Sequence, residues 1–223
     1  MSLIFARVVN DLIKGRHICP YTDQEGYAFL ESDVLINRGM NEFNEPRMIT
    51  NAEDVNEYFS RMGMRLTKTG GGIAYFAAYQ DAEECKKKAR ERFGELKNTI
   101  RPLISFLDLI MRATGDDGAI TPGRKFDVNQ VMARIASDEA YLDLLRQTAV
   151  ETNLKSSDTT DRGRLLKIIG KFVKAELLEE VNPAAEIYQF TGRLEYVLEA
   201  IEFLMEHDQI PDEDEQFNNR GSA

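Results

Sequence analysis

Residues Asp158–Phe190 read DTTDRGRLLKIIGKFVKAELLEEVNPAAEIYQF. This segment predicts a helix that is capped by Thr159 or Thr160, because short hydroxyl side chains are favoured just before a helix begins. Two short β-prone runs follow, at Leu177–Glu180 and Glu186–Phe190, with a turn around Asn182-Pro183 between them. The segment therefore predicts one helix followed by a small antiparallel hairpin.

The predicted helix is amphipathic. Its apolar residues fall on one side at 100° per residue, and most of its basic residues fall on the roughly opposite side. The apolar set is Leu165, Ile168, Ile169 and Phe172. A basic face of this kind suits phosphate or an acidic partner, and it is equally typical of an ordinary solvated surface. The candidate DNA-binding residues are Lys155, Arg162, Arg164, Lys167, Lys171 and Lys174, of which Arg162 points toward the apolar side.

A similar order of elements is predicted near the N-terminus. Helices are expected at Leu3–Lys14, at Tyr21–Glu31 and from an Asn51 cap to about Met62, with a long loop or insertion at Ser32–Thr50. Two β-prone runs, Met64–Lys68 and Ile73–Tyr79, flank Thr69–Gly72, which predicts a hairpin with a flexible tip. Helices followed by a hairpin are typical of a winged helix. The predicted fold class is therefore mainly α with small β-hairpins (α+β), built as tandem winged-helix domains.

Four segments are expected along the chain. Residues 1–80 form an N-terminal winged-helix domain, 81–101 a charged connector helix, 102–206 a C-terminal winged-helix domain, and 207–223 an acidic, disordered tail. Within the third segment, helices are predicted from Pro102 to about Ala113, over Asp127–Ser137, over Asp138–Val150 and over Arg193–Glu206.

The last of these helices carries an acidic stripe. Glu195, Glu199, Glu202 and Glu206 occupy a narrow arc of its surface. One interpretation is a solvated face, and the other is a binding surface for a basic partner.

Composition limits the classes of function. The chain has 223 residues, 43% of them hydrophobic and 30% charged, which is typical of a folded globular protein. Its net charge is −10, and that charge argues against tight DNA binding by the isolated protein. Any DNA contact is expected from a local patch inside a larger assembly. The sequence has no apolar run near the ~20 residues that a membrane helix needs, and its start lacks a signal-peptide pattern, so a cytoplasmic protein is expected.

Residues suited to catalysis or metal binding are sparse. Cys19 and Cys85 lie far apart, which favours a reducing compartment without a disulfide. The two histidines, His17 and His207, complete no nucleophile–base pattern and no zinc-ligand spacing. Thr69–Gly72 lacks the spacing of a phosphate-binding loop. We therefore expect no enzyme, no metal and no cofactor.

Several stretches resemble one known family. They are LIKGRHI at residues 12–18, GYAFL at 26–30, VNEYFSRMGMRLTKT at 55–69 and GIAYFAA at 72–78. These stretches are similar to the MukE/MksE-like subunits of bacterial condensins, which are kite proteins that bind kleisins through tandem winged helices. The segment DTTDRGRLLKIIGKFVKAELLEEV and the acidic tail are also similar, so the resemblance covers most of residues 3–206.

The resemblance implies a non-catalytic subunit. It would form a homodimer through its N-terminal winged helices, bind a MukF/MksF-like kleisin and work beside a MukB/MksB-like SMC ATPase. It would be associated with the nucleoid, hold DNA that it binds weakly alone, and act in chromosome condensation and segregation or in defence against plasmids. Two alternatives stay open: a stand-alone tandem winged-helix transcriptional regulator, and an enzyme with an unrecognised site.

Overall fold

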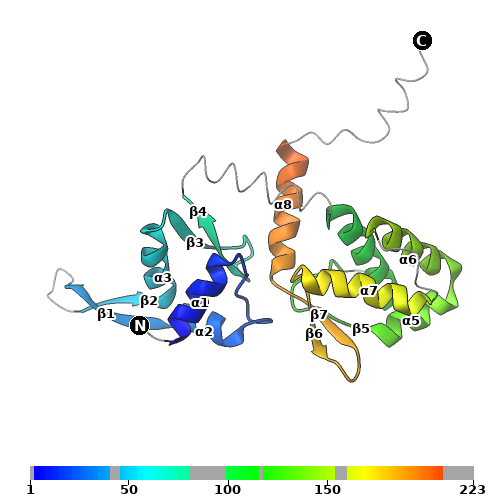
Figure 1. The fold of residues 1–223 in the computed structure, drawn as a ribbon, viewed down its shortest axis with the longest axis horizontal. Helices are drawn as coiled ribbons and strands as arrows, with labels where there is room; N and C mark the ends of the chain where they lie inside the picture. The colour runs from blue at the N-terminus through cyan, green and yellow to red at the C-terminus, as the bar shows by residue number, and fades with distance from the viewer. Residues whose placement is uncertain (1–2, 41–45, 81–98, 116–117, 154–159, 208–223) are drawn as a thin grey trace, which may run out of the picture.

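The computed structural model describes residues 3–40, 46–80, 99–115, 118–153 and 160–207. The described chain consists of helices and small antiparallel sheets, which confirms the predicted α+β class. Figure 1 shows two groups of elements with helix α8 (Arg193–His207) between them. We call the described residues up to 80 the first unit and those from 99 onward the second unit.

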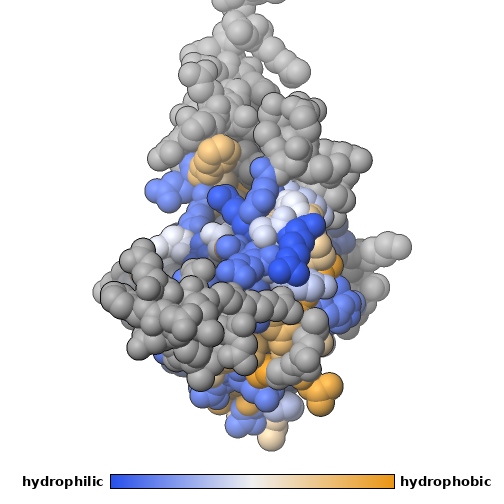
Figure 2. All heavy atoms as spheres, turned by 90° about the vertical axis from the view of Figure 1, so that its left-hand side faces the viewer, coloured by the Kyte–Doolittle hydropathy of each residue, from blue (hydrophilic) through white to orange (hydrophobic). Residues whose placement is uncertain are grey.

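The first unit packs helices around one small hairpin. Its helices are α1 (Leu3–Ile13), α2 (Gln24–Glu31) and α3 (Asn51–Ser60), and its hairpin pairs β3 (Met64–Lys68) with β4 (Tyr75–Tyr79). These elements share a core whose fully buried members are Val8, Leu12, Leu30, Val55 and Phe59. Figure 2, which looks onto this side of the molecule, shows a largely hydrophilic coloured surface with hydrophobic residues gathered near its lower edge.

The predicted loop at Ser32–Thr50 is wrong, because this segment contains a second hairpin. Strand β1 (Asp33–Met40) pairs antiparallel with β2 (Pro46–Thr50), in a register that places Asp33 opposite Thr50. Gly39 and Pro46 favoured a loop in the sequence. Pro46 instead begins a strand of a two-stranded sheet, a position that proline tolerates.

The start of α3 also differs from the prediction. Thr50, rather than Asn51, is the residue that caps the helix. Its hydroxyl accepts the Glu53 N–H at 3.1 Å, and its own N–H donates to the Glu53 carboxylate at 2.8 Å. This reciprocal arrangement is a capping box, and it satisfies two backbone donors at once. The extended backbone of β2 runs directly into the cap, which is why the helix starts without a loop.

The second unit contains four helices followed by a hairpin, and this hairpin is part of a three-stranded sheet. A helix over residues 99–114 is followed by β5 (Lys125–Asp127), α5 (Val128–Ser137), α6 (Glu139–Glu151) and α7 (Asp161–Lys174). Strands β6 (Leu178–Asn182) and β7 (Ile187–Phe190) form the hairpin predicted after α7. Strand β5 was not predicted, because three residues are too short for a periodic signal. It pairs with β7 and gives the order β5-β7-β6.

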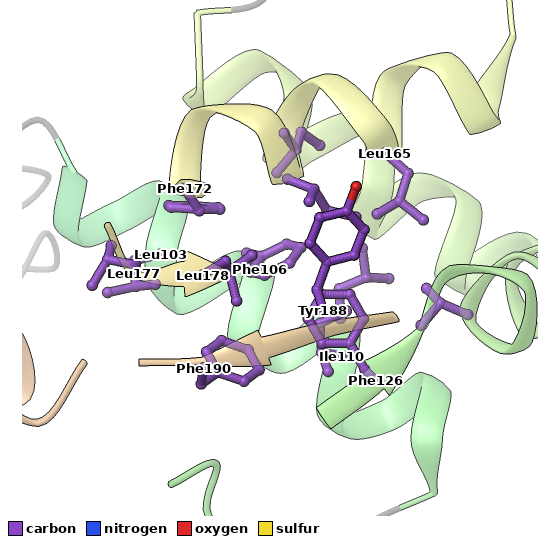
Figure 3. Packing of buried hydrophobic residues seen from close by; sticks show 14 of the residues in the cluster. Leu103, Phe106, Ile110, Phe126, Leu165, Phe172, Leu177, Leu178, Tyr188 and Phe190 are labelled. Carbon is purple, nitrogen blue, oxygen red and sulfur yellow. The ribbon is translucent and has the colours of Figure 1, made fainter. Parts of the chain in front are cut away.

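An aromatic cluster fixes α7 against this sheet (Figure 3). The Phe106 ring centroid lies 4.8 Å from that of Phe172 on α7 and 5.9 Å from that of Phe126 on β5. Phe126 in turn lies 5.6 Å from Phe190 on β7. Each such pair contributes about 0.5–1.5 kcal/mol beyond burial alone. Because Phe172 is held inward, the opposite side of α7 must face outward.

Candidate functional site: the basic helix and the junction of the two units

Helix α7 is amphipathic as predicted. Thr160 caps it, since the Thr160 hydroxyl accepts the Gly163 N–H at 3.1 Å. Leu165, Ile168, Ile169 and Phe172 are buried, while Lys167, Lys171 and Lys174 are exposed. The three lysines follow one another at i, i+4 and i+7, so they form a single stripe along the helix. We call these three residues the lysine stripe.

The two arginines of the predicted DNA-binding set form ion pairs with carboxylates of the same chain. Arg162 donates to Asn129 at 3.1 Å and also to the carboxylate of Glu186, the last residue of the turn between β6 and β7. Arg164 pairs with Asp161 on its own helix at 2.5 Å. Both guanidinium groups therefore stabilise the start of α7 and are already compensated by carboxylates.

The members of the lysine stripe differ in their surroundings. The Lys171 ammonium donates to the backbone carbonyl of Thr152, the C-cap residue directly after α6. An interaction of this type satisfies a carbonyl at a helix end, where a cation is also favoured by the helix dipole. Lys174 is the last residue of α7 and lines a cavity beside Lys14. Lys155, the remaining predicted contact, lies outside the described residues.

The acidic stripe on α8 has a role that the sequence did not predict. The Glu195 carboxylate accepts a hydrogen bond from the Thr69 hydroxyl, and the Glu199 carboxylate accepts the Gly70 N–H at 2.5 Å. Both donors belong to the tip of the β3–β4 hairpin, and Thr69 is only 3% exposed. Glu202 is exposed, and of Glu206 only the backbone is described. Two of the four glutamates therefore join the units, instead of facing solvent or a partner.

The glycines of the hairpin tip make this contact geometrically feasible. A Cβ atom at Gly71 would lie 1.9 Å from a Glu195 carboxylate oxygen, and one at Gly70 would lie 3.0 Å from Glu199. The sequence indicated only a flexible tip; in the structure these glycines also permit the close approach of a helix. Three consecutive glycines are the sequence signal that could have indicated it.

Three aromatic rings extend the junction. The His17 ring centroid lies 5.6 Å from Phe76 on β4 and 4.9 Å from Tyr196 on α8, and the last two lie 5.0 Å apart. Nearby, the Gly192 N–H points to the Cys19 thiol at 3.4 Å. His17 is thus part of the packing between the units.

Charged residues line the junction as well. Glu176 accepts a hydrogen bond from Arg193 at 2.9 Å and lies 3.6 Å from Arg16. These residues border a cavity of about 320 Å³ that also contains Glu179, whose pKa is raised by burial. Among the described residues, no group of three or more histidine, cysteine, aspartate or glutamate side chains is placed to hold a metal ion. In the same part of the chain, no helix is both long enough and apolar enough to span a membrane.

Comparison with known proteins identifies the family of the chain. No curated protein matches the chain. The family described as condensin complex protein MksE matches residues 47–202, which include the hairpin tip, the lysine stripe and both bonded glutamates of α8. The match covers more than half of the 223 residues, so the chain belongs to the MksE family of condensin complex subunits.

Proposed function

We propose that this protein is a non-catalytic subunit of a bacterial SMC–kleisin condensin, in which it binds the kleisin and helps to hold duplex DNA. Membership of the MksE family supports the assignment to such a complex. The protein would act in chromosome condensation and segregation or in defence against plasmids, in the cytoplasm at the nucleoid. The ATP chemistry would belong to the SMC partner.

Both units are proposed to be winged helices. The support in the second unit is the sheet order β5-β7-β6, with α7 directly before the β6–β7 hairpin. In the first unit, α3 likewise precedes the β3–β4 hairpin. In a winged helix, the helix before the hairpin is the one that is presented to DNA. The first unit would mediate homodimerisation.

The observation that carries the DNA proposal is the lysine stripe on the exposed side of α7. A stripe of lysines supplies phosphate contacts, which dominate non-specific DNA affinity. The whole chain nevertheless carries a net charge of −10, so its own field repels DNA. Both facts fit a subunit that contacts DNA only after a complex has placed the DNA beside α7.

Partner binding is tested by light scattering after size-exclusion chromatography. The protein is measured alone and mixed with the kleisin-like protein encoded beside it. A dimer that shifts to a stable complex with the kleisin is expected. If the protein ignores the kleisin and binds duplex DNA alone at physiological salt, the condensin proposal fails and a stand-alone regulator replaces it.

DNA holding is tested on the assembled complex with its SMC ATPase. Lys167→Glu is expected to weaken capture of duplex DNA, and Lys171→Ala to weaken it less, because the first variant reverses a charge and the second only removes one. Lys125→Glu is the matched control, since Lys125 is an exposed lysine of the same unit that lies on β5 and not on α7. Unchanged capture by the Lys167→Glu complex would contradict a role for α7.

A further inference from the structure

A second cavity lies where the two units meet, and its volume is about 430 Å³. Its described lining includes the end of α1 with Lys14 and Gly15, the end of α7 with Lys174, the first turns of α8 with Arg193 and Tyr196, and Thr99 of the helix over residues 99–114. Figure 1 shows the ends of α1 and α7 converging beside α8. Two lysines from different units therefore line one cavity.

The ammonium groups of both lysines form no ion pair among the described residues. Lys14 and Lys174 are exposed, and neither has an ion-pair or hydrogen-bond partner for its side chain among the described residues. Among the described residues that line the cavity, the only carboxylate is that of Glu176, which is already compensated by Arg193 at 2.9 Å and approached by Arg16 at 3.6 Å. The neighbouring Glu195 carboxylate is directed to Thr69 instead. The cavity therefore carries excess positive charge.

A simpler role for these lysines is to cap the two helix ends. The backbone already performs that task. The Lys14 N–H donates to the Asn10 carbonyl and the Gly15 N–H to the Leu12 carbonyl, while the Ala175 N–H reaches the Lys171 and Val173 carbonyls. Because backbone donors close both last turns, the two ammonium groups remain available for an external anion.

Lys174 is also the final member of the lysine stripe, so the stripe runs into this cavity. A polyanion lying along Lys167 and Lys171 would reach Lys174 and then Lys14 of the first unit. The bonds of Glu195 and Glu199 to the hairpin tip join the two units and so help to keep Lys14 and Lys174 at the same cavity. An anion bound here would contact both units at once.

We propose that Lys14 and Lys174 form a phosphate-binding site at the junction of the two units, and that its ligand is a phosphodiester of duplex DNA. This inference rests on the proposed function, in which the lysine stripe faces DNA. It adds a DNA contact from the first unit, which the sequence did not indicate. A consequence is that DNA binding depends on the relative placement of the two units, and not on α7 alone.

The test measures the salt dependence of duplex DNA binding by the assembled complex. The variants are Lys14→Ala, Lys174→Ala and the double variant. Arg61→Ala is the control, because Arg61 is an exposed cation of the first unit at the end of α3. Each lost phosphate contact is expected to reduce the salt slope by about one. Between about 50 and 200 mM salt, the loss of affinity should then be about 3.5-fold smaller per contact.

The outcomes separate this inference from the function on which it rests. If Lys14→Ala behaves like Arg61→Ala while Lys167→Glu still weakens binding, the junction site is refuted and the proposed function stands. If Lys167→Glu also has no effect, the proposed DNA-holding role of α7 fails with it. Urea midpoints equal to wild type show that each variant is folded. Inorganic pyrophosphate distinguishes the source of phosphate: Lys14-dependent pyrophosphate binding by the protein alone, with DNA binding unchanged, would overturn a DNA ligand.

Discussion

The contact between the hairpin tip and α8 makes a quantitative prediction for Gly71→Ala. The φ angle of Gly71 is not positive, so alanine can adopt its backbone conformation. Alanine also lowers the conformational entropy of the unfolded chain, which stabilises the folded protein by about 0.4–1 kcal/mol. The new Cβ, however, would lie 1.9 Å from the Glu195 carboxylate and must displace it. The bond from Thr69 is then lost, and a hydrogen bond to a charged group is worth about 1.5–3 kcal/mol. Partial exposure of Glu195 favours the lower end, so we expect a net loss of about 1 kcal/mol.

A double-mutant cycle isolates this contact. Free energies of unfolding are measured in urea for wild type, Gly71→Ala, Glu195→Ala and the double variant. In the Glu195→Ala background the clash is gone, so Gly71→Ala should be neutral or stabilise by about 0.4–1 kcal/mol. Hydrogen exchange of the Gly70 amide, which donates to Glu199 at 2.5 Å, should accelerate in Gly71→Ala if the tip leaves α8. An equal cost in both backgrounds, with unchanged Gly70 exchange, would refute the proposed contact.

Other variants test neighbouring parts of the argument. Gly192→Ala should destabilise the protein, because its Cβ would lie 2.8 Å from the Cβ atoms of both Cys19 and Ala74 in the first unit. Gly170→Ala should instead stabilise α7 by about 0.5–1 kcal/mol in urea unfolding, because nothing lies within 4 Å of a Cβ at this position. Thr50→Ala should cost about 1 kcal/mol through loss of the capping box, whereas Thr50→Ser should restore most of it. Hydrogen bonds from Lys68 and then Tyr75 lower the pKa of Glu31, so the stability that Glu31 contributes is present above its unfolded pKa of about 4.3 and is lost as pH falls through its lower folded pKa. Glu31→Gln should therefore lose less stability than wild type on acidification, as followed by urea midpoints between about pH 5 and pH 3; an unchanged pH profile would contradict this account of Glu31.

Local patterns in the sequence were sufficient for most elements. The side of α7 that is buried follows from the spacing of Leu165, Ile168, Ile169 and Phe172, because a helix places residues three and four apart on one face. The β3–β4 and β6–β7 hairpins follow from short β-prone runs around turn residues. The family likeness, seen first in stretches such as residues 55–69, is confirmed by the match over residues 47–202.

Pairing between distant segments was beyond such patterns. Strand β5 is recognisable only through its partner β7, and the β1–β2 hairpin interrupts what composition alone indicates is a loop. The hydrogen bonds that define β5 come from a strand far along the chain, with Phe126 opposite Tyr188, whereas β1 and β2 are consecutive strands that pair with each other. Strand β5 has only three residues and so carries no periodic signal, whereas β1 contains the apolar run Val34-Leu35-Ile36, which the polar composition of the whole segment obscures.

The sequence by itself determined which residues form amphipathic helices and hairpins, and which side of α7 is basic, because these depend on neighbours within a few positions. Only the tertiary structure decided what the charged side chains do. Arg162 and Lys171 form contacts inside the second unit, and Glu195 and Glu199 accept hydrogen bonds from the hairpin tip. Lys14 and Lys174 line one cavity. The physical reason is that the effect of a charge depends on which groups lie within a few ångströms in space, and residues as far apart as Thr69 and Glu195 become neighbours only after folding.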